Sequence, residues 1–392
     1  MYKILTLNNI SVAGLDRLPR DSYEVASEVS HPDAILLRSY KMHDMEVPPT
    51  VQAVGRAGAG VNNIPVADMT SKGIPVFNAP GANANAVKEL VLAGALLAAR
   101  NLGQAWRFAT DLDGSDPEVS KQVESGKKDF VGFELPGRTM GVIGLGAIGV
   151  KVANACRALG MNVIGYDPTI TVQSAWKLAS EVEQALSVDD LLSKSDFVTF
   201  HVPLTDATAD MINADRLKLM KPGSVLLNFA RNGIINDQAA VEALDSGHLY
   251  AYVCDFPNNL LKDHPRVITL PHLGASTKEA EDNCAIMVAD QVKDYLENGN
   301  ITNSVNFPSI NLPRNGGHRI AVVNNNVPNM VGQISTDLAN EGLNILDMLN
   351  KSRDDVAVTL LDVDQKPSEQ LIETLSTIEG VLSVRSLNGI TN

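Results

Sequence analysis

The sequence has few cysteines, no long apolar run and fewer basic than acidic residues. Its three cysteines, Cys156, Cys254 and Cys284, cannot all be paired, and their spacing is not that of a metal site. We therefore expect reduced, mostly buried thiols and no metal. Lysine and arginine number 32 against 46 acidic residues, a net charge of -14. Because nucleic acid and anionic membranes bind basic surfaces, this charge argues against both as partners.

No apolar run is long enough to span a membrane. The N-terminal stretch MYKILTLNNI also lacks a basic segment followed by an apolar stretch and a cleavage site of small residues. We therefore expect an enzyme or regulator of the cytoplasm. With 392 residues, the chain exceeds what one hydrophobic core usually supports, so two or three domains are expected.

The order of apolar patterns predicts an α/β protein. Up to about residue 290, short apolar runs alternate with helical patterns, as in GIPVFNAPG followed by NAVKELVLAGALLAARN, which is typical of a parallel sheet with crossover helices. Residues 303–318 contain two prolines and a Gly-Gly pair and interrupt this rhythm. Beyond them a βαββαβ order predicts a small ferredoxin-like domain.

A glycine-rich loop predicts a dinucleotide site. Gly144, Gly146 and Gly149 have the spacing G-x-G-x-x-G between an apolar strand and a helical pattern, and Asp167 ends the next apolar run. Glycines let a pyrophosphate approach the backbone, and the helix N-terminus supplies amide donors. Asp167 would bind the ribose hydroxyls and repel a 2′-phosphate, so NAD is favoured over NADP.

Polar residues follow several of the predicted strands. His201, Arg231, Asp255 and His272 each close an apolar run, and ligands of open α/β sheets bind at the carboxyl ends of strands. Taken singly, an arginine or histidine there could serve packing or a structural ion pair. Together, an arginine that binds a carboxylate and a histidine that exchanges a proton predict oxidation of a hydroxy acid.

Six motifs, in this order, carry a resemblance to a known family: GRAGAGVNNI, FNAPGANANAVKELVLAG, GVIGLGAIG, HVPLT, NFARNG and PHLGAST. The chain resembles the D-2-hydroxyacid dehydrogenases, in particular members with a C-terminal ACT regulatory domain. The resemblance implies two Rossmann/flavodoxin-like doubly wound domains plus a ferredoxin-like ACT domain. The implied divisions are a substrate domain at 1–98 and 288–304, an NAD domain at 99–287, a linker at 305–317 and an ACT domain at 318–392.

The resemblance also implies a reaction and its residues. Arg231 would hold the substrate carboxylate and His272 would be the general acid/base, while Arg56, Ala57 and Gly58 would contact the substrate from the other domain. The implied cofactor residues are Gly144, Gly146, Ala147, Ile148, Gly149, Asp167, His201, Val202, Pro203, Phe229, Ala230, Asp255, His272 and Gly274. The expected activity is NAD-dependent oxidation of 3-phosphoglycerate to 3-phosphohydroxypyruvate, which opens serine biosynthesis. The alternatives are a dehydrogenase of another D-2-hydroxy acid and a non-catalytic NAD-sensing protein.

One departure from the family bears on the catalytic histidine. Family members place a glutamate shortly after the position of Asp255, where it bonds the histidine, whereas this chain has Asn258 and Asn259, and the next acid is Asp263. Asp263 could substitute, an asparagine could orient the ring, or the histidine could work unassisted. Loss of the anion should lower the histidine pKa and move the acid limb of the oxidation profile to lower pH.

The ACT resemblance implies an effector site and self-association. ACT domains commonly bind an amino acid between paired copies, and Asn324, Asn326 and Asn344 occupy the contact positions that the serine-sensitive members imply for L-serine. The family often has histidine at the position of Asn324 and glycine at that of Asn329, so a domain used only for assembly is the alternative. The resemblance implies a homodimer or homotetramer.

Overall fold

The computed structural model describes residues 1–387 and divides the chain into two compact units. One unit joins Met1–Ala82 to the chain from Lys278 onward, and the other is Asn83–Thr277. The last five residues of the expected 318–392 domain lie outside the described part. Within residues 1–387, no helix is both long enough and apolar enough to cross a bilayer.

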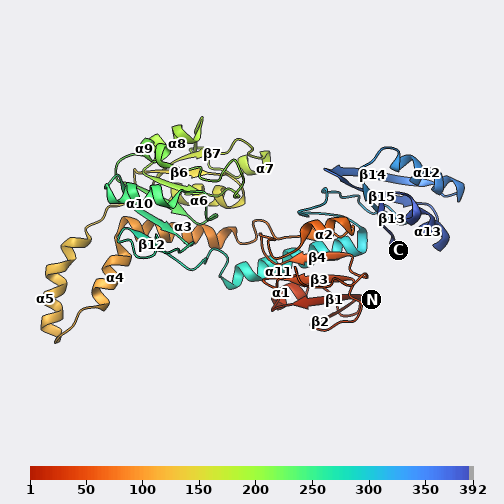
Figure 1. The fold of residues 1–392 in the computed structure, drawn as a ribbon, viewed down its shortest axis with the longest axis horizontal. Coiled ribbons are helices and arrows are strands. Elements are labelled where there is room, and N and C mark those ends of the chain that lie inside the picture. The colour runs from red at the N-terminus through yellow and green to blue at the C-terminus, as the bar shows by residue number, and fades with distance from the viewer. Residues whose placement is uncertain (388–392) are drawn as a thin grey trace. The chain divides into compact units, whose positions relative to one another are not determined.

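The unit Asn83–Thr277 is built on a parallel sheet (Figure 1). Its strands are β6 (Thr139–Ile143), β7 (Asn162–Tyr166), β8 (Glu183–Gln184), β9 (Phe197–Phe200), β10 (Ser224–Asn228), β11 (Leu249–Cys254) and β12 (Val267–Thr269). Their order is β12-β11-β10-β9-β6-β7-β8. Within this sheet, the chain therefore passes from β6 outward through β7 to β8, and then returns to β9 on the other side of β6. The reversal between β6 and β9 is the point where such sheets bind ligands.

Helices cover both faces of this sheet, so strands such as β9 and β10 are buried along their whole length. One face carries α3 (Ala84–Ala99) and α6 (Ala147–Ala158), and the other carries α8 (Val188–Lys194), α9 (Ala214–Leu219) and α10 (Asp237–Asp245). The short α7 (Val172–Ala175) follows β7.

Residues 102–130, to which the sequence assigned no element, form helices. They are α4 (Leu102–Thr110), α5 (Asp116–Gly126) and a 3-10 turn, η1 (Lys127–Phe130). None of these helices has a buried residue, so although α4 is amphipathic, its apolar face is not covered by a core within the described residues. A capping box between Ser115 and Glu118, with Pro117 in the first turn, begins α5 and was the available signal.

The other unit begins with a second parallel sheet in the order β2-β1-β3-β4-β5. Its strands are β1 (Tyr2–Leu7), β2 (Tyr23–Ala26), β3 (Ala34–Leu37), β4 (Ala53–Arg56) and β5 (Val76–Phe77), with helices α1 (Val12–Leu15) and α2 (Val66–Ser71). The returning helix α11 (Lys278–Asn298) packs on α1, β3 and β4. A Cβ at Gly55 would lie 2.7 Å from a methyl carbon of Val288, so glycine lets α11 approach β4 closely.

The compact units divide at 82/83 and 277/278, rather than at the expected 98/99 and 287/288. The reason is packing: α3 contacts α6, β10 and β11, whereas all of α11 belongs with the first sheet. Residues 305–317, which were expected to be a linker, are not an exposed connection, because Phe307, Ile310 and Leu312 are buried in the core.

The C-terminal part has the expected βαββαβ order. It consists of β13 (His318–Asn325), α12 (Met330–Asn340), β14 (Ile345–Arg353), β15 (Val356–Val363), α13 (Glu369–Thr377) and β16 (Val381–Leu387). The sheet is antiparallel in the order β14-β15-β13-β16, and α12 packs beside α13. With the two parallel sheets, this confirms the expected fold class.

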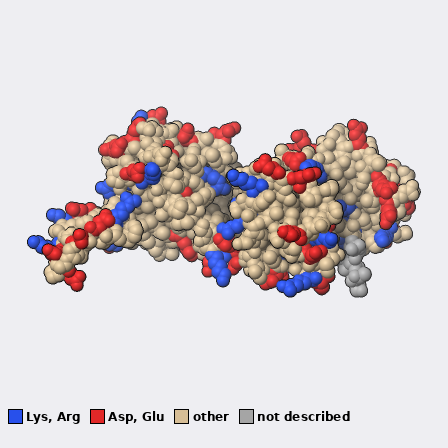
Figure 2. Space-filling view, turned by 60° about the horizontal axis from the view of Figure 1, so that its bottom comes forward, with Lys and Arg blue, Asp and Glu red and all other residues tan. Residues whose placement is uncertain are grey.

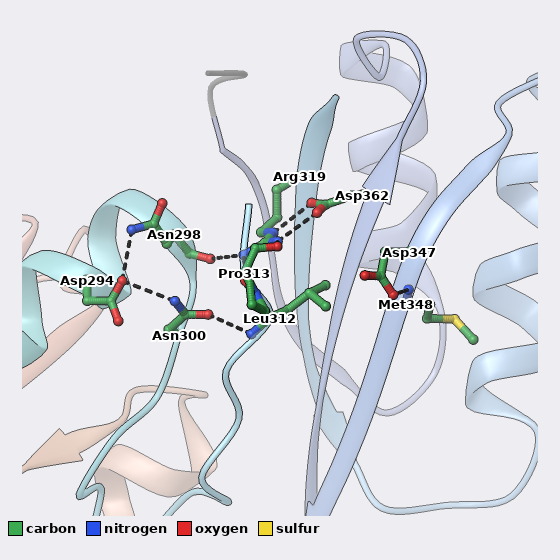
Figure 3. Close-up of polar contacts among 9 residues, drawn as sticks. All are labelled: Asp294, Asn298, Asn300, Leu312, Pro313, Arg319, Asp347, Met348 and Asp362. Atoms are coloured by element: carbon green, nitrogen blue, oxygen red, sulfur yellow. Dashed lines mark hydrogen bonds and ion pairs between the residues drawn. The ribbon is translucent and has the colours of Figure 1, made fainter. Parts of the chain in front are cut away.

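A buried ion pair ties this small domain to the end of α11 (Figure 3). Arg319 of β13 donates to both carboxylate oxygens of Asp362 on β15, at 2.7 Å each. Its other donors reach the carbonyls of Asn298 at 3.1 Å, Leu312 at 2.6 Å and Pro313 at 3.2 Å. All five guanidinium N–H bonds thereby have acceptors.

Charged side chains lie on the surfaces of both units. Figure 2 shows acidic side chains spread over the visible face with basic ones among them, in keeping with the net charge of -14. Among the buried exceptions, Arg319 and Asp362 are 0% and 1% exposed and have each other as partners.

Candidate active site

The glycine loop after β6 is closed on the protein side and open at its centre. Gly144 has φ +90°, and a Cβ there would lie 2.6 Å from the carbonyl oxygen of His201. A Cβ at Gly149 would lie 1.8 Å from the carbonyl oxygen of Gly144. At Gly146, the N-cap of α6, a Cβ would meet nothing within 4 Å. The three glycines thus serve a turn, an open approach and close packing, which is the arrangement that a pyrophosphate requires.

Ala147 and Ile148 begin α6 directly behind this opening. The first amides of a helix have no acceptor within it, so they can bind phosphate oxygens. The expected roles of these two residues as backbone donors therefore fit the structure.

Asp167 lies just beyond β7 and is held against the loop. One carboxylate oxygen accepts from the amide of Leu145 at 2.8 Å, and the other from the amide of Thr169 at 2.9 Å. These bonds fix the carboxylate beside the glycine loop, where the ribose of a dinucleotide is expected. Thr169, which also donates its hydroxyl to Asp167 at 3.2 Å, was not predicted from the sequence.

His201 follows β9 on the other side of the strand reversal. Its Nε2 lies 3.1 Å from the hydroxyl of Thr199, and its Nδ1 is buried with no partner in residues 1–387. Burial lowers the pKa of His201 to about 3, so the ring is neutral at ordinary pH. Val202 and Pro203 continue from it, and Val202 lies against Gly144. The neutral ring makes His201 a hydrogen-bonding group of the cleft rather than an acid/base.

Arg231 leaves β10 through a turn held by Asn228. The Asn228 amide nitrogen donates to the carbonyl of Arg231 at 2.9 Å, and its oxygen accepts from the amide of Ala230 at 3.2 Å. Phe229 is buried within the turn, and Arg231 is exposed. Asn228 is a supporting residue that the sequence reasoning missed, although a buried asparagine at a strand end is a recognisable turn signal.

Asp255 and His272 leave the paired strands β11 and β12. The amide of His272 donates to the carbonyl of Asp255 at 3.1 Å, and His272 has φ +49°, in the left-handed region. The Asp255 side chain is buried, and the backbone amides of Leu273 and Gly274 lie near its carboxylate, but within residues 1–387 neither oxygen makes a hydrogen bond of ordinary geometry. Burial raises the pKa of Asp255, and His272 when protonated, together with the backbone amides of Leu273 and Gly274, opposes that rise.

Two unsatisfied oxygens in a buried site require a donor. A carboxamide would supply one, so the geometry of Asp255 fits a nicotinamide. Gly274 lies next to it, where a Cβ would be 3.8 Å from a carboxylate oxygen. The open Gly146, the fixed Asp167 and the unsatisfied Asp255 together fit NAD.

The residues that follow Asp255 do not supply an anion to His272. Asn258 donates to Asp237 at 2.7 Å and accepts from the amides of Leu260 and Leu261, at 3.0 Å each. Asp263 is 84% exposed and lies 3.9 Å from Lys262. Of the three interpretations offered for the missing glutamate, the structure favours a histidine without carboxylate assistance.

Arg56, Ala57 and Gly58 lie together at the end of β4 in the other unit. Arg56 Nε donates to the carbonyl of Arg38 at 3.0 Å, and a Cβ at Gly58 would lie 1.8 Å from an Arg56 guanidinium nitrogen. Only glycine therefore lets this guanidinium lie over the loop. Arg38, which follows β3 and pairs with Glu281 at 2.8 Å, adds a cation that the sequence reasoning missed. The position of Arg38 directly after a buried strand was the sequence signal that could have identified it.

The three expected effector residues do not meet within one chain. Asn324 pairs with Ala357 of β15, and the adjoining Asn326 donates to the carbonyl of Asp354 at 3.1 Å. The amide of Asn344 instead bonds the Asp364 carboxylate, at 3.0 Å. Ala357 and Asp364 are separated by the length of β15, about 23 Å at ~3.3 Å per residue. A single copy thus brings Asn324 and Asn326 together and leaves Asn344 at the opposite end of the sheet.

The comparisons with known proteins agree with this geometry. Residues 96–274 match the family model described as D-isomer specific 2-hydroxyacid dehydrogenase, NAD binding domain. A protein of Escherichia coli named D-3-phosphoglycerate dehydrogenase is 31% identical over 351 residues, covering 86% of this chain and 81% of that protein. The chain belongs to the D-isomer specific 2-hydroxyacid dehydrogenase family. Its cofactor is NAD.

Other family members differ in length. A Methanocaldococcus jannaschii protein, also named D-3-phosphoglycerate dehydrogenase, is 38% identical over 296 residues, covering 73% of this chain. The chain spans 54% of the length of that relative. A solved structure of a Thermus thermophilus protein aligns with a TM-score of 0.62 and 26% identity, covering 77% of this chain and 99% of that one.

Proposed function

We propose that the protein oxidises 3-phospho-D-glycerate to 3-phosphohydroxypyruvate with NAD, the first step of L-serine biosynthesis. The observation that carries this proposal is the placement of an exposed arginine and an exposed histidine, Arg231 and His272, at the carboxyl edge of the sheet that holds the glycine loop. The relatives named D-3-phosphoglycerate dehydrogenase support the substrate.

The residues divide the work of the reaction. The Arg231 guanidinium pairs with the substrate carboxylate, because its planar fork is always charged and binds two oxygens at once. The neutral imidazole of His272 accepts the hydroxyl proton as the hydride leaves the same carbon. Bound NAD supplies the hydride acceptor. Asp255 would accept a hydrogen bond from the carboxamide N–H and so help to hold the nicotinamide.

A phosphate on the substrate requires additional cations. Arg56 and Arg38 follow neighbouring strands, and the carbonyl of Arg38 accepts a hydrogen bond from Arg56. We assign phosphate binding to Arg56, with Arg38 beside it. If the substrate were another D-2-hydroxy acid, activity would not depend on the phosphate.

The test is NADH formation from 3-phosphoglycerate, compared with glycerate, lactate and 2-hydroxyglutarate. We expect a strong preference for the phosphorylated acid, its loss in Arg56→Ala, and no turnover in His272→Ala. A uniform rate with all four acids would contradict the proposed substrate.

The missing glutamate favours a second candidate, a non-catalytic NAD-sensing protein. Such a protein would bind NADH without oxidising any hydroxy acid. Both ideas predict NADH binding, so turnover decides between them.

We further propose that the C-terminal domain is an ACT domain that pairs with a second copy, in a homodimer or homotetramer. The separation of Asn344 from Asn324 supports pairing, since only a second copy could bring an Asn344 to the other two asparagines. Asn324 also has a buried side-chain oxygen without a partner in residues 1–387, as an effector site would. L-serine is the proposed effector. Equilibrium dialysis with L-serine should show binding that Asn344→Ala weakens, and sedimentation should show an oligomer.

We also propose that the protein works in the cytoplasm. All three of its cysteines are free and buried, in keeping with a reducing compartment. Fractionation of cells that express the chain tests this, and recovery outside the cytoplasmic fraction would contradict it.

A further inference from the structure

The backbone of His272 is fastened to the chain just before Phe256. Strands β11 and β12 pair in parallel with Cys254 opposite Thr269, so the residues that follow them leave the sheet at the same edge. The amide of His272 lies 3.1 Å from the carbonyl oxygens of both Asp255 and Leu270. The left-handed φ of +49° at His272 is held by these bonds.

The imidazole of His272 meets the ring of Phe256. Their centroids are 5.2 Å apart and their planes cross at 63°, an edge-to-face contact. His272 is otherwise exposed, so this contact limits the directions that its ring can take.

Phe256 is itself held in place from two sides. Its ring packs against the core cluster beneath β10 and β11. Two residues later, Asn258 bonds Asp237 of α10 at 2.7 Å and accepts from the amides of Leu260 and Leu261. The asparagine at the position near which the family has its glutamate therefore fixes the loop that carries the phenylalanine.

Within the described residues, no charged group near the imidazole of His272 orients it by a hydrogen bond. Asp255 influences it through its charge, but its carboxylate oxygens make no hydrogen bond of ordinary geometry in residues 1–387. Asp237 is bonded to Asn258, and Asp263 is exposed beside Lys262. Across the described residues, no carboxylate makes a hydrogen bond to the His272 ring.

We propose that Phe256 is the positioning residue of His272, taking by an aromatic contact the orienting role that a carboxylate has elsewhere in the family. The inference rests on the proposed function. During oxidation, the hydrogen on the reacting carbon leaves with its electron pair as hydride, and the O–H proton passes to a nitrogen of His272. The imidazole ring thereby becomes imidazolium. A ring held at a constant angle keeps that nitrogen aimed at the hydroxyl.

Phe256→Leu keeps an apolar side chain and removes the ring, whereas Phe256→Tyr keeps the ring. The matched control is Phe133→Leu, since Phe133 makes an edge-to-face contact with Tyr250 at 5.3 Å and 66°. Tyr250 lies at the start of β11, at the end away from Asp255. The control therefore removes an edge-to-face aromatic contact in the same unit without touching the site, together with the contacts of Phe133 to Phe197 and Arg138.

With 3-phosphoglycerate, we expect Phe256→Leu to lower kcat by about three- to tenfold, the worth of one aromatic contact. KM and the Kd for NADH should stay within about twofold, because the residues assigned to hold substrate and NADH are left unchanged. Phe256→Tyr and Phe133→Leu should retain kcat. A kcat in Phe256→Leu equal to that of the control would overturn the proposal.

A second measurement does not depend on turnover. In the unmodified protein, the ring current of Phe256 should displace the imidazole proton resonances of His272, which are assigned by their loss in His272→Gln. Resonances at random-coil positions would overturn the inference without any variant. If the unmodified protein oxidises no 2-hydroxy acid, the proposed function fails, and displaced resonances would still support the contact.

Discussion

Arg319 and Asp362 form a doubly hydrogen-bonded ion pair inside the C-terminal domain, with both N···O distances at 2.7 Å. The remaining donors of Arg319 bond the carbonyls of the segment that leaves α11 (Figure 3). On that segment, Asn300 accepts from the amide of Leu312 at 3.1 Å and donates to Asp294 of α11. One buried cation thus joins two strands of the small domain to the chain that precedes it.

Asp362→Asn should therefore destabilise the protein strongly. The substitution leaves a buried guanidinium without its anion, which costs about 3–5 kcal/mol in the free energy of unfolding. Urea denaturation measures the change. The control is Asp215→Asn, whose partner Lys218 lies 3.0 Å away with both side chains more than two-thirds exposed, and no measurable change is expected there. Equal effects of the two substitutions would contradict the role assigned to Arg319.

The glycine loop predicts two different outcomes for two alanine substitutions. In Gly149→Ala the new Cβ would lie 1.8 Å from the carbonyl oxygen of Gly144, so the loop must shift and both stability and NADH binding should fall. In Gly146→Ala the Cβ meets no protein atom within 4 Å, so the melting temperature should be unchanged. The Kd for NADH should nevertheless rise, by at least about tenfold, because the methyl group occupies the approach of the pyrophosphate. Calorimetric melting and fluorescence titration separate the two effects.

His201 predicts a pH dependence of stability. Burial lowers its pKa to about 3 from 6.5, so between these pH values the unfolded chain binds a proton that the folded chain does not. Its contribution to stability is complete above the unfolded pKa and is lost as the pH falls, by about 1 kcal/mol per pH unit below pH 6. His201→Gln should flatten the dependence between pH 6 and pH 4. His248→Gln, in the same unit, controls for removal of a histidine elsewhere, and an equal flattening there would contradict this cause.

Asp255 predicts opposed effects on stability and binding. Burial raises its pKa, so the folded state disfavours the carboxylate, and the stability contributed by the protonated form is lost as the pH rises through the folded pKa. Asp255→Asn removes the buried charge and should raise the melting temperature at pH 7. The same change should weaken NADH binding, because one of the two acceptor oxygens becomes a donor amide and the remaining acceptor carries no charge. A less stable variant at pH 7 would contradict this account.

Much of the organisation followed from sequence alone. The spacing of Gly144, Gly146 and Gly149 and the position of Asp167 depend on short-range rules of turn geometry and strand alternation, so the dinucleotide fold and its ligand edge were predictable. The βαββαβ order of the C-terminal domain followed from its periodicity in the same way. The family motifs then assigned roles to Arg231 and His272.

The tertiary structure decided what depends on packing between distant residues. The sequence alone does not show that α3 packs on the second sheet, that α4 and α5 form without a buried face, or that Arg38 lies beside Arg56. Strand register alone places Asn344 at the far end of the sheet from Asn324. The missing glutamate was visible in sequence, but the contact of Phe256 with His272 was not, because it arises where two paired strands end together.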